Sequence, residues 1–250
     1  MELTVGGRTE TGQRTTNEDR LEWWLDLGLF VVADGMGGHN AGEVASRLAV
    51  DAVHAFIADS ANHGDITWPF GYDASSSVEL NRLTTAVRLA NLRVFGEASR
   101  VPELQGMGTT IVAALISAER VTIASVGDSR AYRWRHGELE QLTRDDTWLN
   151  SVMRPEEIGD ADRTHPLRHV LTRVVGVGED VKPSAREEML KAGDTLVMCT
   201  DGVHGRLDPS ALAQVLRTTA TTTDRAARLV GEALANGTSD NATALVINIG

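Results

Sequence analysis

The chain carries the sequence VVADGMGGHNAGEVAS at residues 31–46. Its first part continues an apolar run, 29–33, which predicts a buried strand that ends at Asp34. Beyond the glycine-rich turn the apolar spacing becomes helical, so we expect a helix over 41–59. Glycines beside Asp34 let other backbone come close and expose carbonyl oxygens. The segment therefore predicts a strand, a turn and a helix, with a carboxylate where the strand ends.

Three further aspartates lie where an apolar run ends or begins: Asp128 after 121–127, Asp201 after 196–200, and Asp240 before 242–249. Carboxylates at the ends of stiff strands can converge, and converging carboxylates repel one another unless a positive group neutralises them. Mg²⁺ and Mn²⁺ prefer oxygen ligands. Single turn aspartates beside glycine are common, but four with this placement favour a divalent-metal site that includes Asp34.

The composition excludes several classes of protein. The 250 residues include 35 acidic and 24 basic side chains, and the net charge of −11 argues against nucleic acid or an anionic membrane as a partner. The single cysteine, Cys199, lies inside an apolar run and is expected to be a core residue, so no disulfide framework exists. We see no signal peptide, and no apolar run approaches the ~20 residues of a membrane helix. We therefore expect a cytoplasmic protein.

The strand and helix patterns come in blocks. Strands are expected at 3–11, 21–26, 29–33, 109–117, 120–127, 130–135, 138–142, 170–175, 194–200 and 242–249. Helices are expected at 41–59, 77–99, 209–217 and 223–236. Residues 144–166 are polar and predict a long surface loop. Because strands and helices come in blocks rather than in strict βαβ alternation, we expect an α+β fold with antiparallel sheets. Because the candidate site residues come from both ends of the chain, we expect a single domain over 1–250.

Two other groups of residues suit phosphate chemistry. Residues 14–19, RTTNED, contain Arg14, whose planar guanidinium suits a phosphate, and the carboxylates Glu18 and Asp19. His39, in the glycine-rich turn, can titrate near neutral pH. A nucleotide-binding loop is disfavoured, because the glycines match neither G-x-G-x-x-G nor G-x-x-x-x-G-K-[ST].

The order and wording of these segments resemble the metal-dependent serine/threonine protein phosphatases of the type 2C (PPM) family, in their bacterial single-domain form. The matching pieces are RTTNED at 14–19, VVADGMGGHNAGEVAS at 31–46, GMGTT at 106–110, VGDSRAYR at 126–133, LTRVVG at 171–176, TDGV at 200–203 and SDNATALVI at 239–247. They extend over essentially the whole chain. The combination of DGMGGH, GDSR, TDG and DN in this order is highly specific.

The resemblance implies a four-layer αββα sandwich, in which two antiparallel sheets are flanked by helices. It also implies two bridged Mn²⁺ or Mg²⁺ ions at one end of the sheets. Carried over position by position, Asp34 bridges both ions and the Gly35 carbonyl binds one of them. Asp201 and Asp240 bind the other ion. Asp128, together with Asp201, would hold a third and weaker ion.

The resemblance implies further roles around these ions. Arg14 would bind the substrate phosphate, while Glu18 and Asp19 would orient metal-bound water. Asn241 would support the metal ligands and the water-orienting carboxylates without binding a metal itself. The leaving serine or threonine oxygen needs a proton, which His39 or a metal-bound water would supply.

The function implied is hydrolysis of phosphoserine and phosphothreonine by a hydroxide that bridges the two metals, in bacterial signalling. The partners would be phosphorylated proteins, namely a serine/threonine kinase and its substrates, and the enzyme would be a monomer. Residues 144–166 correspond to a flap beside the active site, and their unusual wording bears on substrate selection.

Three alternatives remain beside this interpretation. The first is a catalytically silent phosphoprotein sensor, which the presence of all the expected ligands disfavours. The second is a phosphatase dedicated to one regulator, which the sequence does not test. The third is a cysteine-dependent phosphatase, which is disfavoured because Gly205 stands six positions after Cys199, where such enzymes place arginine.

Overall fold

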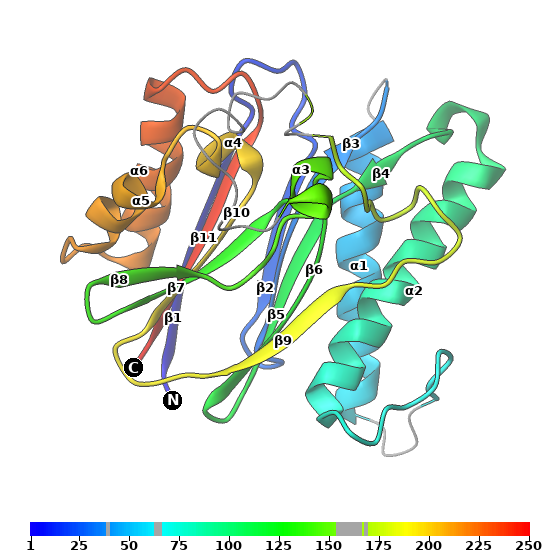
Figure 1. The fold of residues 1–250 in the computed structure, drawn as a ribbon, viewed down its shortest axis with the longest axis horizontal. Coiled ribbons are helices and arrows are strands. Elements are labelled where there is room, and N and C mark those ends of the chain that lie inside the picture. Colours follow the sequence, from blue (N-terminus) through cyan, green and yellow to red (C-terminus); the bar gives the residue numbers. More distant parts are fainter. Residues whose placement is uncertain (39–40, 63–66, 154–166, 168–169) are drawn as a thin grey trace.

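Two antiparallel β-sheets stacked face to face form the centre of the protein, with helices on both outer faces (Figure 1). The structure, a computed structural model, describes residues 1–38, 41–62, 67–153, 167 and 170–250. The four layers confirm the predicted αββα sandwich.

The first sheet joins the two ends of the chain. Its strand order is β1 (Leu3–Glu10), β11 (Ala242–Ile249), β10 (Thr195–Cys199), β7 (Arg130–Arg135) and β8 (Glu138–Gln141). Its outer face carries α4 (Asp201–His204), α5 (Pro209–Leu216) and α6 (Thr222–Ala235) (Figure 1). Helix α5 begins as the sequence predicts, because Pro209 fits the first turn and the Asp208 carboxylate accepts a hydrogen bond from Ala211 N at 2.8 Å.

The second sheet carries the glycine-rich segment. Its order is β2 (Asp19–Trp24), β3 (Leu29–Met36), β5 (Ile111–Ser117), β6 (Arg120–Val126) and β9 (Ser184–Met189), and the short β4 (Gly108–Thr109) also pairs with β3. Two long helices, α1 (Ala41–Asn62) and α2 (Val78–Arg100), cover its outer face. Two shorter helical segments are η1 (Pro102–Leu104) and α3 (Trp148–Val152).

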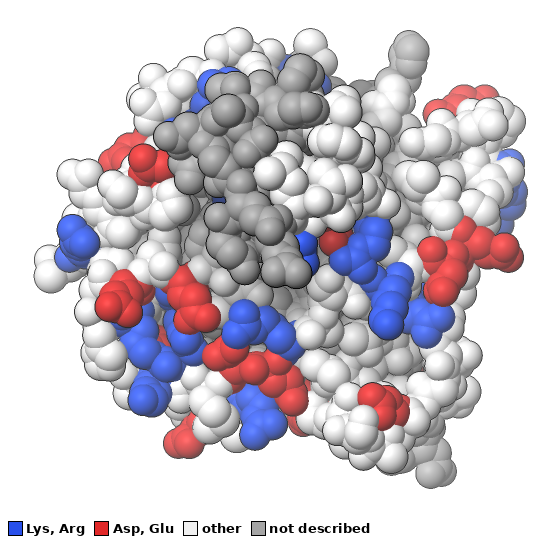
Figure 2. Space-filling view, in the orientation of Figure 1, with Lys and Arg blue, Asp and Glu red and all other residues white. Residues whose placement is uncertain are grey.

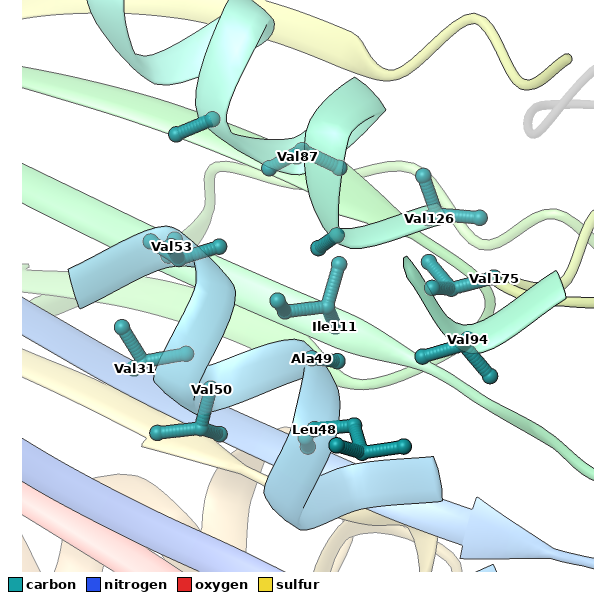
Figure 3. Packing of buried hydrophobic residues seen from close by; sticks show 14 of the residues in the cluster. Val31, Leu48, Ala49, Val50, Val53, Val87, Val94, Ile111, Val126 and Val175 are labelled. Carbon is teal, nitrogen blue, oxygen red and sulfur yellow. The ribbon is translucent and has the colours of Figure 1, made fainter. Parts of the chain in front are cut away.

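Three apolar cores lie between the four layers, which explains why several strands are apolar on both faces. In β3, Val31 faces α1 and α2 (Figure 3), whereas Phe30 and Val32 face the other sheet. In β11, Leu245 belongs to the core between the sheets and Val246 to the core beneath α5 and α6. Such strands lack the apolar–polar alternation of a half-exposed strand because neither face meets water.

Two strand predictions differ from the structure. Residues 170–175, expected as a strand, make only isolated bridges, from Leu171 to Thr147 and from Val175 to Thr109. Strand β9 was not predicted, because SAREEM is largely charged. It is an edge strand that pairs on one side only, with β6, so its side chains remain partly in water.

The two ends of the chain lie together at one pole of the molecule (Figure 1). The Gly250 N–H donates a hydrogen bond to the Glu2 carbonyl at 2.8 Å. In the antiparallel sheets, the C-terminal ends of β3, β6 and β10 and the N-terminal ends of β2 and β11 therefore meet at the opposite pole. Within the described part of the chain, no helix is both long enough and apolar enough to cross a membrane.

Candidate metal centre and active site

The fold places the predicted aspartates together. Asp34 lies near the end of β3, and its Cα partner on β2 is Asp19. Asp128 follows β6, Asp201 opens α4 directly after β10, and Asp240 precedes β11. Each residue thus occupies the pole where these strand ends meet.

Electrostatic coupling shows how closely these carboxylates approach one another. Loss of solvent raises the pKa of Asp34 well above its ordinary value, and repulsion raises it further, in decreasing order, from Asp19, Asp201, Asp128 and Asp240. The five carboxylates therefore form one cluster around Asp34, made of the four strand-end aspartates and Asp19.

Two members of this cluster are buried more deeply than the rest. Asp19 is 7% exposed and Asp128 is 6% exposed. Burial, followed by repulsion from Asp201, raises the pKa of Asp128 to about 7. Burial also raises the pKa of Asp19 to about 7, against two hydrogen bonds that lower it. Without a neutralising cation, the cluster would hold protons near neutral pH.

The donor set fits a hard divalent cation. The cluster offers oxygen atoms alone, and the buried Asp19 Oδ1 has no hydrogen-bond partner among the described residues. No group of three acidic, histidine or cysteine side chains in the described ranges is already arranged around one ion. Mg²⁺ does not require such a group, since it binds through one or two carboxylates and keeps several waters.

Gly35 occupies a crowded position beside Asp34. A Cβ atom there would lie 2.1 Å from the Gly42 carbonyl oxygen and 2.7 Å from the Glu18 carbonyl oxygen. Only glycine allows these backbones to approach, and the Gly35 N–H donates to Glu18 O at 3.1 Å. Several carbonyl oxygens are thereby gathered next to the cluster.

Arg14 stands at the rim of the site. Its guanidinium donates a hydrogen bond to Asp240 Oδ2 at 2.7 Å, and 54% of its side chain is exposed. It remains accessible to an anion that enters from solution.

A family model, described as "Protein phosphatase 2C", matches residues 6–236 of this chain. The chain belongs to the protein phosphatase 2C family. Serine/threonine protein phosphatase PstP of Mycobacterium tuberculosis is 33% identical over 253 residues, which is 99% of this chain but 45% of that protein. The chain thus spans slightly less than half of the PstP sequence. Serine/threonine phosphatase stp of Listeria monocytogenes is 32% identical, covering 96% of this chain and 93% of that protein.

Solved structures of family members share the whole fold. The catalytic domain of PstP, in complex with two manganese ions, has a TM-score of 0.83 at 32% identity and covers 99% of each chain. The S. agalactiae serine/threonine phosphatase has a TM-score of 0.86 at 28% identity, and the match covers 100% of each chain. The type 2C resemblance and the predicted sandwich are therefore confirmed.

Asn241, next to Asp240 in the family's DN motif, fixes the segment that carries Arg14. Its Nδ2 donates to the carbonyl oxygens of Thr11 and Thr16, each at 2.9 Å, and its Oδ1 accepts from Glu18 N at 2.8 Å. One neutral side chain therefore satisfies three backbone groups of a turn that has no sheet partner of its own.

Sequence reasoning gave no role to two residues of the site: Thr200, the first residue of the TDG motif, and His204, which was expected to be a surface or capping histidine. Thr200 donates through Oγ1 to Asp19 Oδ2 at 2.9 Å and accepts from Thr243 N at 3.1 Å, so it joins the sheets at the cluster. His204 Nε2 lies 3.0 Å from the Asp128 carbonyl oxygen and links α4 to the loop after β6. Their position around Asp201 was the available signal.

Two predictions for the 2C site lie wholly or partly outside the described residues. His39 is one. The other is the flap predicted at 144–166, of which the structure describes only residues 144–153.

The described start of the flap is held by two aspartates. Arg130 forms a bidentate ion pair with Asp145: its Nε donates to Asp145 Oδ1 at 2.9 Å and its Nη2 donates to Asp145 Oδ2 at 2.7 Å. Asp146 accepts from Gly127 N at 3.0 Å, which anchors the start of this segment beside Asp128.

Proposed function

We propose that this chain is a metal-dependent phosphatase that hydrolyses phosphoserine and phosphothreonine in proteins. The observation that carries the proposal is the cluster of five carboxylates around Asp34 with the exposed guanidinium of Arg14 beside it. The relatives of this chain in M. tuberculosis and L. monocytogenes are serine/threonine phosphatases, which supports the same reaction class.

The cluster is assigned two divalent ions, Mn²⁺ or Mg²⁺. Asp34 would bridge them, the Gly35 carbonyl would bind one, and Asp201 and Asp240 would bind the other. Asp128, with Asp201, would hold a third ion. Bound ions would neutralise the phosphate dianion and lower the pKa of a shared water, so that a bridging hydroxide exists near pH 7.

The protein groups have separate tasks in this reaction. Arg14 binds the phosphate oxygens and orients the phosphorus for in-line attack. Glu18 and Asp19 accept hydrogen bonds from water in the cleft and orient it. The bond from phosphorus to the serine or threonine oxygen breaks as the new P–O bond forms, and His39 is proposed to protonate the leaving oxygen.

The proposal extends to the partner, the compartment and the oligomeric state of the enzyme. The enzyme would remove phosphate groups added by a bacterial serine/threonine kinase, in the cytoplasm, as a monomer with one catalytic domain over 1–250. The single cysteine, the buried Cys199, fits a reducing compartment, and the net charge of −11 argues against nucleic acid as a partner.

The test measures phosphate release from a phosphothreonine peptide, with and without Mn²⁺, by the native chain and by Asp34→Asn. We expect metal-dependent turnover that Asp34→Asn abolishes. The matched control is Asp51→Asn, since Asp51 lies exposed on α1 and should not matter. No turnover by a folded, manganese-loaded native chain would contradict the proposal and favour a phosphoprotein sensor.

A further inference from the structure

A cavity lies between β6, β9 and the loop after β8, outside the carboxylate cluster. It has a volume of about 250 Å³, and its walls come from β6, from residues 141–144 after β8, and from residues 184–186 of β9. None of the five clustered carboxylates lines it. It therefore needs an explanation separate from the metal centre.

Hydroxyl groups in its walls have hydrogens to donate. Ser125 is 2% exposed, and its hydroxyl makes no hydrogen bond with any described residue. The Thr143 hydroxyl accepts from Ala131 N at 3.1 Å, and the Ser184 hydroxyl accepts from the Arg173 guanidinium at 2.7 Å. Because both are acceptors in these bonds, each keeps its own O–H for a ligand.

Two arginines supply the charge of the cavity. The Arg144 guanidinium donates to the Asn150 carbonyl and has no ion pair within the described ranges. Arg186 is paired with Glu188 and lies 3.9 Å from Glu140, and 42% of its side chain remains exposed. Arg144 is therefore the arginine of this cavity whose charge is not compensated within the described ranges. No aspartate or glutamate lines this cavity, whereas three other cavities in the described part of the chain each have a carboxylate in their walls.

This wall composition is unusual for the surface around it. The chain has more acidic than basic residues, and Figure 2 shows the two signs interspersed over the face that β8 and β9 form. A wall with two guanidinium groups, three hydroxyl groups and no carboxylate repels cations. An apolar ligand would displace water from the Ser125 hydroxyl without replacing its hydrogen bond.

We propose that this cavity binds a phosphate-type oxyanion. Such a group presents acceptor oxygens in several directions, which matches donors from β6, β9 and the loop after β8. Two sources share this chemistry: inorganic phosphate, and the phosphorylated side chain of another protein. The binding itself does not depend on the proposed activity.

The cavity is connected to the loop that carries Asp128. Arg173, which donates to Ser184 in the cavity wall, also forms an ion pair with Asp146. The other oxygen of Asp146 accepts from Gly127 N, directly before Asp128. Three polar contacts thus connect Ser184 to Gly127, the residue directly before Asp128.

Equilibrium dialysis of labelled inorganic phosphate against the manganese-loaded full chain tests the proposal. We expect a binding component that Arg144→Gln or Ser125→Ala weakens about tenfold and that Arg14→Gln leaves unchanged. Arg228→Gln is the matched control, because Arg228 is a partly exposed arginine on α6 paired with Glu232. Thermal midpoints establish that each variant folds.

Binding that responds to Arg14→Gln alone, or to neither cavity variant, would overturn the inference. Phosphate release from the phosphothreonine peptide is measured in parallel. If the native chain releases phosphate from the peptide but shows no phosphate binding that Arg144→Gln weakens, the cavity proposal fails and the proposed activity stands. If Arg144→Gln weakens phosphate binding but the native chain releases no phosphate, only the proposed activity fails.

A competition experiment separates the two sources. Labelled phosphate at the Arg144-sensitive component is challenged with unlabelled phosphate or with a peptide that carries a non-hydrolysable phosphonate in place of phosphothreonine. Displacement by both assigns the cavity to a phosphorylated protein, and displacement by phosphate alone assigns it to the free anion. Displacement by neither contradicts the proposal.

Discussion

Asn241 shows how one uncharged residue organises a highly charged site. It neutralises nothing, yet its amide holds three backbone groups of the turn from Thr11 to Glu18. An aspartate in its place would have no N–H groups for the carbonyls of Thr11 and Thr16 and would add another negative charge. The identity of this side chain therefore follows from hydrogen-bond geometry.

We expect Asn241→Ala to lower kcat/KM for a phosphothreonine peptide by about 10–100-fold, because Arg14 would lose its fixed position. Steady-state kinetics measure the effect. Asn248→Ala is the control, since Asn248 lies on the same strand and contacts Thr195 and Arg225 at the far end. Equal losses in both variants would show that Asn241 has only a general structural role.

Gly35→Ala should be poorly tolerated. The added Cβ would meet two carbonyl oxygens beside the cluster, so we expect a loss of about 1–3 kcal/mol in the free energy of unfolding together with weaker Mn²⁺ binding. Denaturant unfolding and calorimetric Mn²⁺ titration measure both. Gly96→Ala is the control, because a Cβ on this exposed α2 residue meets nothing within 4 Å. It should stabilise by about 1 kcal/mol, and similar behaviour of the two variants would refute the steric argument.

At the scale of elements, the sequence predicted strands best where they are buried on both faces. Strands β3 and β11 are continuous apolar runs, so their ends, and with them Asp34 and Asp240, could be located. Strand β9 was not predicted, because an edge strand pairs with only one neighbour and its side chains can be charged. The strand predicted at 170–175 was wrong because the backbone hydrogen bonds of this run go to separate partners, such as Thr109 and Asp146, rather than to one neighbouring strand.

Contacts between distant elements could not be predicted in the same way. Thr200 reaches Asp19 across a separation of 181 positions, and nothing in the local pattern specifies that pairing. The aspartates were identifiable because each carries its own signal, a strand end. Thr200 carries no such signal, because its role depends on where the fold places Asp19 on β2.

The ion pair between Arg130 and Asp145 connects β7 to the start of the predicted flap. Both side chains are largely buried, at 25% and 9% exposure. Asp145→Asn would leave the guanidinium charge uncompensated, and we expect a loss of about 3–5 kcal/mol in the free energy of unfolding. Urea denaturation measures this loss, and Asp51→Asn, which breaks an exposed pair with Arg47, should stay within about 1 kcal/mol. A loss below that bound for Asp145→Asn would mean that water screens the pair.

For the whole molecule, the clustered carboxylates oppose folding when no metal is bound. The pKa values of Asp19 and Asp128 rise from 3.8 to about 7 on folding. Between these values the folded chain binds more protons than the unfolded chain. The free energy of unfolding therefore falls as pH rises through this window.

The thermal midpoint of the metal-free protein should thus fall by several degrees between about pH 5 and about pH 7.5. Added Mn²⁺ should reverse the fall, because the cation replaces the protons. Asp34→Asn should raise the midpoint of the metal-free protein at the upper pH, since it removes one of the repelling charges. Differential scanning calorimetry in EDTA and in Mn²⁺ measures all three, and a midpoint that rises with pH in EDTA would contradict the argument.

The hydrogen bond between Gly250 and Glu2 has a practical consequence for the molecule as a whole. Both ends leave the fold side by side, at the pole farthest from Asp34. A tag, a solid support or another protein attached at either end would lie at the pole opposite the carboxylate cluster. The approach of the proposed phosphoprotein substrate to Asp34 and Arg14 would therefore stay open to solution.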